Sequence, residues 1–150
     1  MKWFKILLIA VVVFFTACNS SQSSSNQSLK SEVRTCPMCN MEVDKSNTHS
    51  SSLARNGTIN YFDDIGCMIL WSNENSADIE KAKVFSKDTK HYIDAASASY
   101  TIGERTPMLY GFCAYENGVE NKIDFDEVVM RMLRGEHMAN PKIRKHILGY

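Results

Sequence analysis

Two short stretches that mix apolar and polar residues flank an Asn-Gly pair in the first half of the chain. The stretch Ser52–Arg55 precedes Asn56 and Gly57, and the stretch Thr58–Phe62 follows them. Two such stretches around Asn-Gly are typical of a β-hairpin, because both turn residues tolerate the left-handed backbone of a tight turn. We therefore expect two antiparallel strands here.

The apolar spacing changes to a helical period directly after this hairpin. Ile65, Met68 and Ile69 recur at intervals of three and four residues, and the pair Asp63-Asp64 precedes them. An aspartate in this position caps a helix by accepting hydrogen bonds from its first free N–H groups. We expect a helix that ends near Asn73.

The same order returns in the second half of the chain. Residues 111–115 and 119–123 flank a second Asn-Gly pair, Asn117-Gly118, and a helical pattern follows from Val128 to Leu133 after Asp124 and Asp126. The pattern predicts a second hairpin followed by a second helix.

Short β-prone runs separate the two halves, at residues 83–86, 91–94 and 98–102. Together these elements predict an α+β fold built from two ββαβ-type halves, with a mostly antiparallel sheet. The chain closes after Pro141 with a short helix expected over residues 142–148, for which the sequence indicates no function.

The N-terminus has the pattern of an export signal. Lys2 and Lys5 precede an apolar run that is too short for a typical membrane span, and small residues follow before Cys18. This resembles a bacterial lipobox, although Phe15 stands where leucine is usual. We expect a signal peptide at 1–17 and, at 18–34, a lipidated Cys18 with a flexible tether; an ordinary signal peptide or an uncleaved anchor is the alternative.

The tether is rich in serine, asparagine and glutamine, so it buries too little apolar surface to fold. The whole chain balances 17 basic against 17 acidic residues. No run of basic residues stands out, which argues against nucleic acid or an anionic membrane surface as a partner. Residues 35–150 have the length of one domain.

Four cysteines remain after Cys18 is set aside, namely Cys36, Cys39, Cys67 and Cys113. An even number in an exported chain allows a disulfide framework with three possible pairings, and the sequence does not choose among them. A chain of this length also builds a core without disulfides. Cys113, in a predicted strand, is expected in the core or paired with Cys67.

The run Cys36-Pro37-Met38-Cys39-Asn40-Met41 gathers two thiols and two thioethers in six residues. Methionine sulfur is a poor ligand for hard or borderline cations and a good ligand for Cu(I), so the run favours Cu(I) over zinc. Cu(I) needs only two or three soft ligands, and one or two cysteines with Met41 supply them. Met38 and Met108 also lie in predicted loops, whereas helical methionines are expected to fill the core.

These features resemble the NosL family, the membrane-anchored copper-binding lipoproteins of nitrous-oxide reductase assembly. The resemblance covers most of residues 35–135 and is carried by the following matches: Cys18, the run from Cys36 to Met41, Tyr61-Phe62-Asp63-Asp64, Tyr92-Ile93-Asp94-Ala95 with Ala98 and Tyr100, and Thr106-Pro107-Met108. It implies a fold related to an organomercury lyase, a location on the periplasmic side of a bacterial envelope membrane, and delivery of Cu(I) through a membrane transporter complex to the maturing reductase, without catalysis.

The resemblance also implies a ligand set of Cys36, Cys39, Met41 and Met108. Asn40 and Leu109 stand where family members usually have glycine. Additional candidate ligands are Met38, Cys67 at the start of a helix, where a thiolate is favoured, and His49 after the cysteine run.

Three classes of function follow from the sequence. The first is a Cu(I) metallochaperone. The second is a thiol-disulfide oxidoreductase that uses Cys36 and Cys39, for which no βαβ pattern surrounds the motif. The third is a structural zinc or disulfide module that mediates contacts in an envelope complex.

Overall fold

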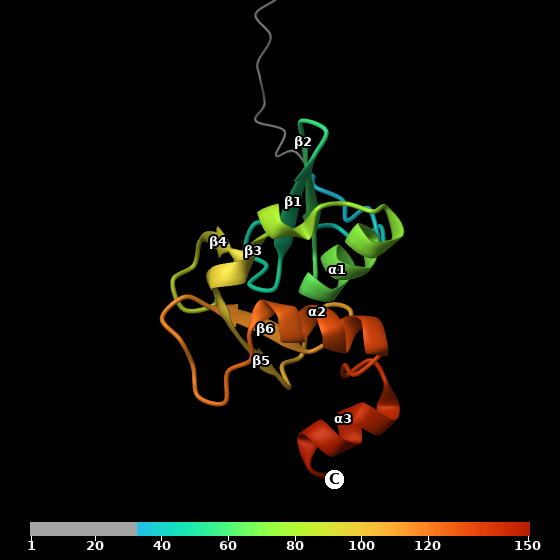
Figure 1. Cartoon of the computed structure of the whole chain (residues 1–150), viewed down its shortest axis with the longest axis vertical. Helices are drawn as coiled ribbons and strands as arrows, with labels where there is room; N and C mark the ends of the chain where they lie inside the picture. The colour runs from blue at the N-terminus through green and yellow to red at the C-terminus, as the bar shows by residue number, and fades with distance from the viewer. Residues whose placement is uncertain (1–32) are drawn as a thin grey trace, which may run out of the picture. The chain divides into compact units, whose positions relative to one another are not determined.

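The first Asn-Gly hairpin forms where the sequence predicts it. A computed structural model describes residues 33–150 (Figure 1). Strand β1 (Ser51–Arg55) pairs antiparallel with β2 (Thr58–Phe62), and Arg55 lies opposite Thr58. Asn56 and Gly57 both have a left-handed backbone, with φ of 50° and 77°. Local turn chemistry therefore sets the register of this hairpin.

Two antiparallel sheets make up the strand layer. The larger sheet has the order β2-β1-β3-β4, in which β3 spans Lys83–Phe85 and β4 spans Tyr92–Asp94. The smaller sheet pairs β5 (Ser99–Ile102) with β6 (Phe112–Tyr115). A parallel bridge between Ser86 and Ala114 connects the two sheets.

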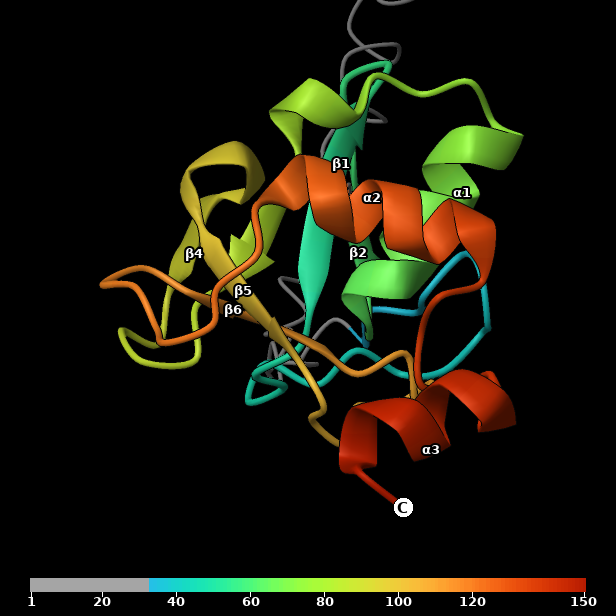
Figure 2. The same ribbon diagram turned by 60° about the horizontal axis from the view of Figure 1, so that its bottom comes forward.

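Three α-helices complete the described chain, and each begins at a capping side chain. Helix α1 (Ile65–Glu74) begins after Asp64, α2 (Phe125–Arg134) after Asp124, and α3 (Pro141–Leu148) after Asn140. Two short 3-10 turns lie at Ile79–Lys81 and Ala95–Ser97. Figure 2 shows α1 and α2 beside the strands, and α3 at the periphery.

The α+β class with antiparallel sheets is confirmed, but the second predicted hairpin is wrong. Strand β6 pairs with β5, and residues 119–123 contribute only one bridge, from Ile123 to Tyr100. The carboxylate of Asp88 accepts hydrogen bonds from the backbone N–H groups of Glu116 and Asn117. These contacts hold the chain beside the 86–90 turn, so Asn117-Gly118 does not form a two-residue hairpin turn.

A single hydrophobic core joins both sheets to α1 and α2. It includes Leu53 and Phe62 from the larger sheet, Tyr100 and Phe112 from the smaller one, and the helical side chains Ile65, Met68, Ile69, Val128 and Met132. Residues Glu32–Tyr150 form one compact unit, and all of these core side chains belong to it. We therefore expect this segment to fold without residues 1–31.

The expected signal peptide, Cys18 and nearly all of the tether fall on residues 1–32, outside the described residues. Among residues 33–150, no helix has the length and apolar content needed to cross a membrane.

Gly66, in the first turn of α1, is in close contact with the second half of the chain. A Cβ atom at this position would lie 2.3 Å from Cδ2 of Tyr110 and 2.8 Å from Cε of Met132. No real side chain makes contacts this short, so a glycine is needed for the loop around Tyr110 to reach α1.

Replacing Gly66 with alanine tests this packing. Helix propensity alone predicts stabilisation by about 1 kcal/mol. The clash with the Tyr110 ring predicts the opposite sign, a loss of about 1–3 kcal/mol in the free energy of unfolding. Urea denaturation measures the difference, and Asn73→Ala, at an exposed site of the same helix, is the control that gains propensity without a clash. An unchanged or higher stability of Gly66→Ala would contradict the packing.

Candidate metal centre

The cysteine run folds into a tight loop. In this cysteine loop, residues Cys36–Met41, the N–H of Cys36 donates to the carbonyl of Met41 and the N–H of Asn40 donates to the carbonyl of Cys36, both at 2.9 Å. A bridge between Thr35 and Glu42 closes its base. Asn40 supplies the left-handed residue, with φ of 61°. The loop thus holds Cys36, at its start, near Cys39.

Three cysteines and one aspartate converge at this loop. The ligand atoms of Cys36, Cys39, Asp63 and Cys67 all lie within 4.8 Å of one another, and we call this group the thiol cluster. Asp63 lies between β2 and α1, and Cys67 lies in the first turn of α1. Cys36, Asp63 and Cys67 are buried, whereas Cys39 is partly exposed. The cluster can therefore be reached from the side of Cys39.

Hydrogen bonds divide the three thiols into two kinds. Cys67 bonds to the sulfur of Cys36 and lowers the pKa of Cys36 to about 6, while the same contact and burial raise the pKa of Cys67. Cys39 donates its S–H to Oδ1 of Asp63 at 3.1 Å. Burial raises the pKa of Cys39 to about 12. One thiolate, at Cys36, and two thiols are thus the expected state near neutral pH. The expectation of a thiolate at Cys67 from its helix position is wrong, because its hydrogen bond to Cys36 and its burial favour the thiol.

Asp63 lacks a partner for part of its carboxylate. Oδ1 accepts the bond from Cys39, but Oδ2 is buried and has no hydrogen-bond partner. No basic side chain of residues 33–150 forms an ion pair with Asp63 or with the neighbouring buried Asp64. Buried carboxylates are normally paired with a cation or bound to a metal. The thiol cluster therefore fits a bound cation, and its three sulfurs favour a thiol-seeking one.

Asp64 orients the start of α1 and holds a second loop against it. Its Oδ1 accepts the N–H of Gly66, and its Oδ2 accepts the N–H of Met108 at 3.1 Å. Thr106 also hydrogen-bonds to this carboxyl, although burial raises the pKa of Asp64 to about 6. This one side chain brings the Thr106-Pro107-Met108 segment to the helix that carries Cys67.

The predicted ligands divide between the cluster and its surroundings. Cys36, Cys39 and the additional candidate Cys67 belong to the thiol cluster. Met41 follows in the loop with 43% of its surface exposed. Met38 and Met108 are partly buried against the core. Their roles as ligands stay predictions.

His49 lies outside the thiol cluster. Its Nε2 is buried without a hydrogen-bond partner, and burial lowers the pKa of its imidazole. Cys113 is buried in β6 and, like the other three described cysteines, is a free thiol. The pairing of Cys67 with Cys113 that the sequence left open is therefore not formed, and Cys113 is a core residue.

Sequence reasoning missed Asp63 as a member of the site. The aspartate pair was assigned to helix capping, and only Asp64 has that role. The sequence did hold a sign of this role. One aspartate is enough to cap a helix, so the second carboxylate of the pair needs another partner.

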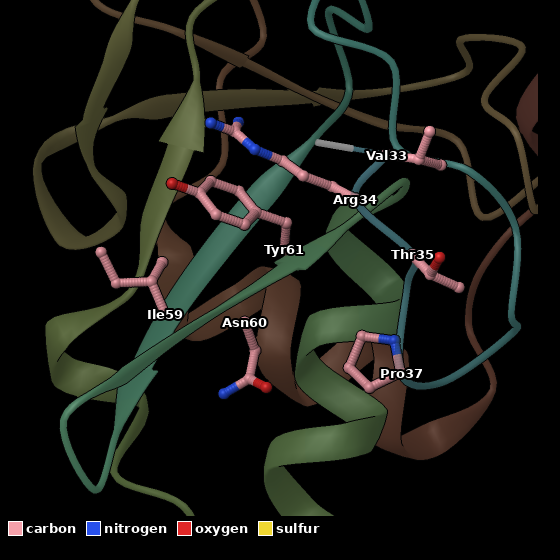
Figure 3. A pocket seen from close by; sticks show the side chains of 7 residues that line it. All are labelled: Val33, Arg34, Thr35, Pro37, Ile59, Asn60 and Tyr61. Atoms are coloured by element: carbon pink, nitrogen blue, oxygen red, sulfur yellow. The ribbon is translucent and has the colours of Figure 1, made fainter. Parts of the chain in front are cut away.

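A surface pocket of about 520 Å³ lies beside the cysteine loop. Pro37 of the loop lines it together with residues 33–35 and residues 59–61 of β2, an edge strand (Figure 3). The guanidinium of Arg34 lies 3.8 Å above the ring of Tyr61. No member of the thiol cluster lines this pocket, so it is separate from the candidate metal site.

No family model, curated protein or solved structure matches this chain. The assignment of the site therefore depends on its own geometry.

Replacing Asp63 with asparagine should stabilise the metal-free domain. The change removes a buried charge that has no cation and keeps the acceptor for Cys39, so we expect a gain of about 1 kcal/mol at pH 7. Asp64→Asn is the matched control, and it should lose about 1–2 kcal/mol because both of its oxygens accept backbone N–H groups. Denaturation of metal-free protein measures both. A loss for Asp63→Asn as large as that for Asp64→Asn would contradict an unpaired charge at Asp63.

The thiol hydrogen bonds predict one thiolate of low pKa. Since the pKa of Cys36 is lowered to about 6, its thiolate should form as pH rises through 6 and be lost below it. Thiolate absorbance in the ultraviolet, recorded on reduced metal-free protein, measures the step. Cys36→Ser should abolish it, Cys67→Ala, which removes the hydrogen-bond donor, should move it to higher pH, and Cys113→Ser should leave it unchanged. A step that persists in Cys36→Ser would refute the assignment.

Proposed function

We propose that this chain is a Cu(I) metallochaperone of the bacterial envelope. It binds the ion at the thiol cluster and transfers it without catalysing a reaction. Export and lipidation at Cys18 hold it on the periplasmic side of a membrane. By its resemblance to the NosL family, the recipient is nitrous-oxide reductase during assembly, reached through a membrane transporter complex.

The convergence of three free thiols on a buried, partly unpartnered carboxylate supports metal binding most directly. Cu(I) needs only two or three sulfur ligands, and the thiol cluster already holds three sulfurs close together. Three methionines supply further sulfur ligands that can bind the ion as it enters or leaves the cluster. Met38 and Met41 belong to the cysteine loop, and Met108 belongs to the loop bound to Asp64.

The positions of the family's glycines also support the proposal. Asn40 and Leu109 replace glycine in this chain, and both have a left-handed backbone, with φ of 61° and 59°. Glycine adopts this conformation without strain, and asparagine tolerates it better than leucine does. The two loops thus have the backbone shape that the family's glycines would favour.

The unequal burial of the cluster suits transfer to a partner. Cys36 and Cys67 have no exposed surface, while Cys39 is partly exposed and Met41 continues the path to solvent. A thiol of the recipient can approach the ion through Cys39 first, and the buried pair then releases it. Ligands exchange one at a time, so the ion is never free in solution.

The geometry disfavours the oxidoreductase alternative. Attack on a disulfide needs an accessible thiolate. Here the thiol with the lowered pKa, Cys36, is completely buried, and the more accessible Cys39 has its pKa raised to about 12.

A structural zinc site is the second candidate, and Asp63 favours it. Zinc takes four ligands and accepts carboxylate oxygen, so three cysteines with Asp63 would complete its coordination. Cu(I) does not need the oxygen. The two ions therefore predict different effects of removing the Asp63 carboxylate.

Titration of reduced residues 32–150 with Cu(I), under a competing chelator, tests the proposal. Cys67→Ser should weaken Cu(I) binding by about 100-fold, since a ligand of the cluster is lost. Cys113→Ser, which removes a buried thiol outside the cluster, should bind like the unchanged chain. Asp63→Asn should weaken Zn(II) binding by at least tenfold more than Cu(I) binding, because zinc uses the carboxylate as a ligand and Cu(I) does not.

The carrier is refuted if the unchanged protein binds Cu(I) no more tightly than a variant in which Cys36, Cys39 and Cys67 are all replaced with serine. Equal affinity for Cys67→Ser alone would remove only Cys67 from the ligand set. Tighter binding of Zn(II) than of Cu(I), with unfolding on removal of zinc, would instead support the structural module.

A further inference from the structure

The charge of the described chain is divided between two regions. Residues 131–150 hold five basic side chains against one acidic side chain, a net charge of +4 with histidine neutral. Residues 33–130 hold nine basic against fifteen acidic, a net charge of −6. The balanced total of the whole chain hides a basic C-terminal segment on an acidic domain. The sequence-based argument against an anionic membrane surface therefore does not apply to residues 131–150.

Helix α3 carries most of this positive charge and packs lightly on the rest of the unit. None of its residues is buried. Ile143 and Ile147, one turn apart, are half-buried, whereas Lys142 and Lys145 are exposed. In both views α3 lies at the periphery, apart from the two sheets (Figures 1 and 2). The lysines therefore face solvent from a helix whose apolar side is directed inward.

Exposed apolar side chains accompany the basic ones. Among residues 33–150, half of the large exposed apolar side chains lie between 130 and 150, namely Met130, Leu133, Leu148 and Tyr150. Leu148 is 41% exposed and Tyr150 is 77% exposed, directly after the lysines. No acidic residue occurs after Glu136. Basic residues beside exposed leucine and tyrosine are typical of segments that bind at a membrane surface.

We propose that α3, with Leu148 and Tyr150, binds the surface of an anionic lipid bilayer. Lys142, Arg144 and Lys145 attract the negative headgroups, and Leu148 and Tyr150 enter the headgroup region. Nucleic acid would use the positive charge alone and would leave the apolar pair exposed. The lipid surface is the partner that matches both features.

This contact is separate from the metal site. None of its residues belongs to the thiol cluster or to the loop of Met108. A second membrane contact beside a lipid anchor at Cys18 would restrict the orientation of the domain, because an anchor at one residue leaves the domain free to rotate. The inference stands whether or not the cluster carries copper.

Sedimentation of residues 32–150 with lipid vesicles tests the proposal. The segment without the N-terminal apolar run is used, because that run would bind any bilayer. We expect binding to vesicles of equal phosphatidylglycerol and phosphatidylcholine at low salt, and none to phosphatidylcholine alone. Raising the salt to about 0.5 M should abolish most of the binding.

Two double variants and one control separate the contribution of charge to binding from that of the apolar side chains. Lys142→Glu with Lys145→Glu should weaken binding by about 30-fold or more, since each basic residue at an anionic surface contributes a factor of about five. Lys81→Glu with Lys122→Glu makes the same charge change at exposed sites outside the segment and should alter binding by less than about threefold. Leu148→Ser with Tyr150→Ser should weaken binding without changing its salt dependence. Circular dichroism verifies that each variant is folded.

Equal binding to both kinds of vesicle, or binding to neither, would overturn the proposal. So would an equal loss in the two lysine pairs, which would indicate an effect of net charge only. A DNA duplex that competes the protein away from anionic vesicles, with unchanged binding in Leu148→Ser/Tyr150→Ser, would assign the segment to nucleic acid instead.

Discussion

The buried carboxylate of Asp64 is the contact on which the candidate site depends. Asp64 follows the hairpin β1-β2 and caps the start of α1. Its carboxylate also accepts the N–H of Met108, from the other half of the chain. Its neighbour Asp63 is thereby directed at the cysteine loop, and Cys67 follows on the first turn of the same helix. Asp64, whose two oxygens are both hydrogen-bonded, thus positions Asp63, which has one oxygen without a partner. The carboxylate of Asp64 contributes stability, and that of Asp63 is available to a cation.

Local chemistry made much of the fold predictable. The first Asn-Gly pair, both helix-capping aspartates and the tail helix lie where the sequence places them, because turns and caps depend on residues a few positions apart. The second Asn-Gly pair does not form the predicted hairpin turn, because Asp88, far away in sequence, accepts hydrogen bonds from the N–H groups of Glu116 and Asn117. Only the fold brings that carboxylate within reach, so no local pattern could reveal the competition.

The site was predictable to a similar degree. The spacing of Cys36 and Cys39 indicated that both thiols can bind one ion, and the position of Cys67 at the start of a helix suggested it as an additional ligand. Asp63 was missed because capping explained the aspartate pair. His49 and Cys113 carry side chains suited to metal binding, but the fold places them outside the cluster. Residue type defined the candidates, and tertiary packing selected among them.

Leu109 keeps a left-handed backbone with 39% of its surface exposed, although it carries a branched side chain. Such a residue costs about 1–2 kcal/mol compared with glycine, and the surrounding hydrogen bonds must hold it. Leucine by itself prefers a negative φ. The N–H of Met108, bonded to Asp64, and the N–H of Leu109, bonded to the carbonyl of Thr106, therefore keep the turn in its shape. The conformation of this turn is thus imposed by its contacts with the start of α1, and a change at Asp64 would alter a loop on the other half of the chain.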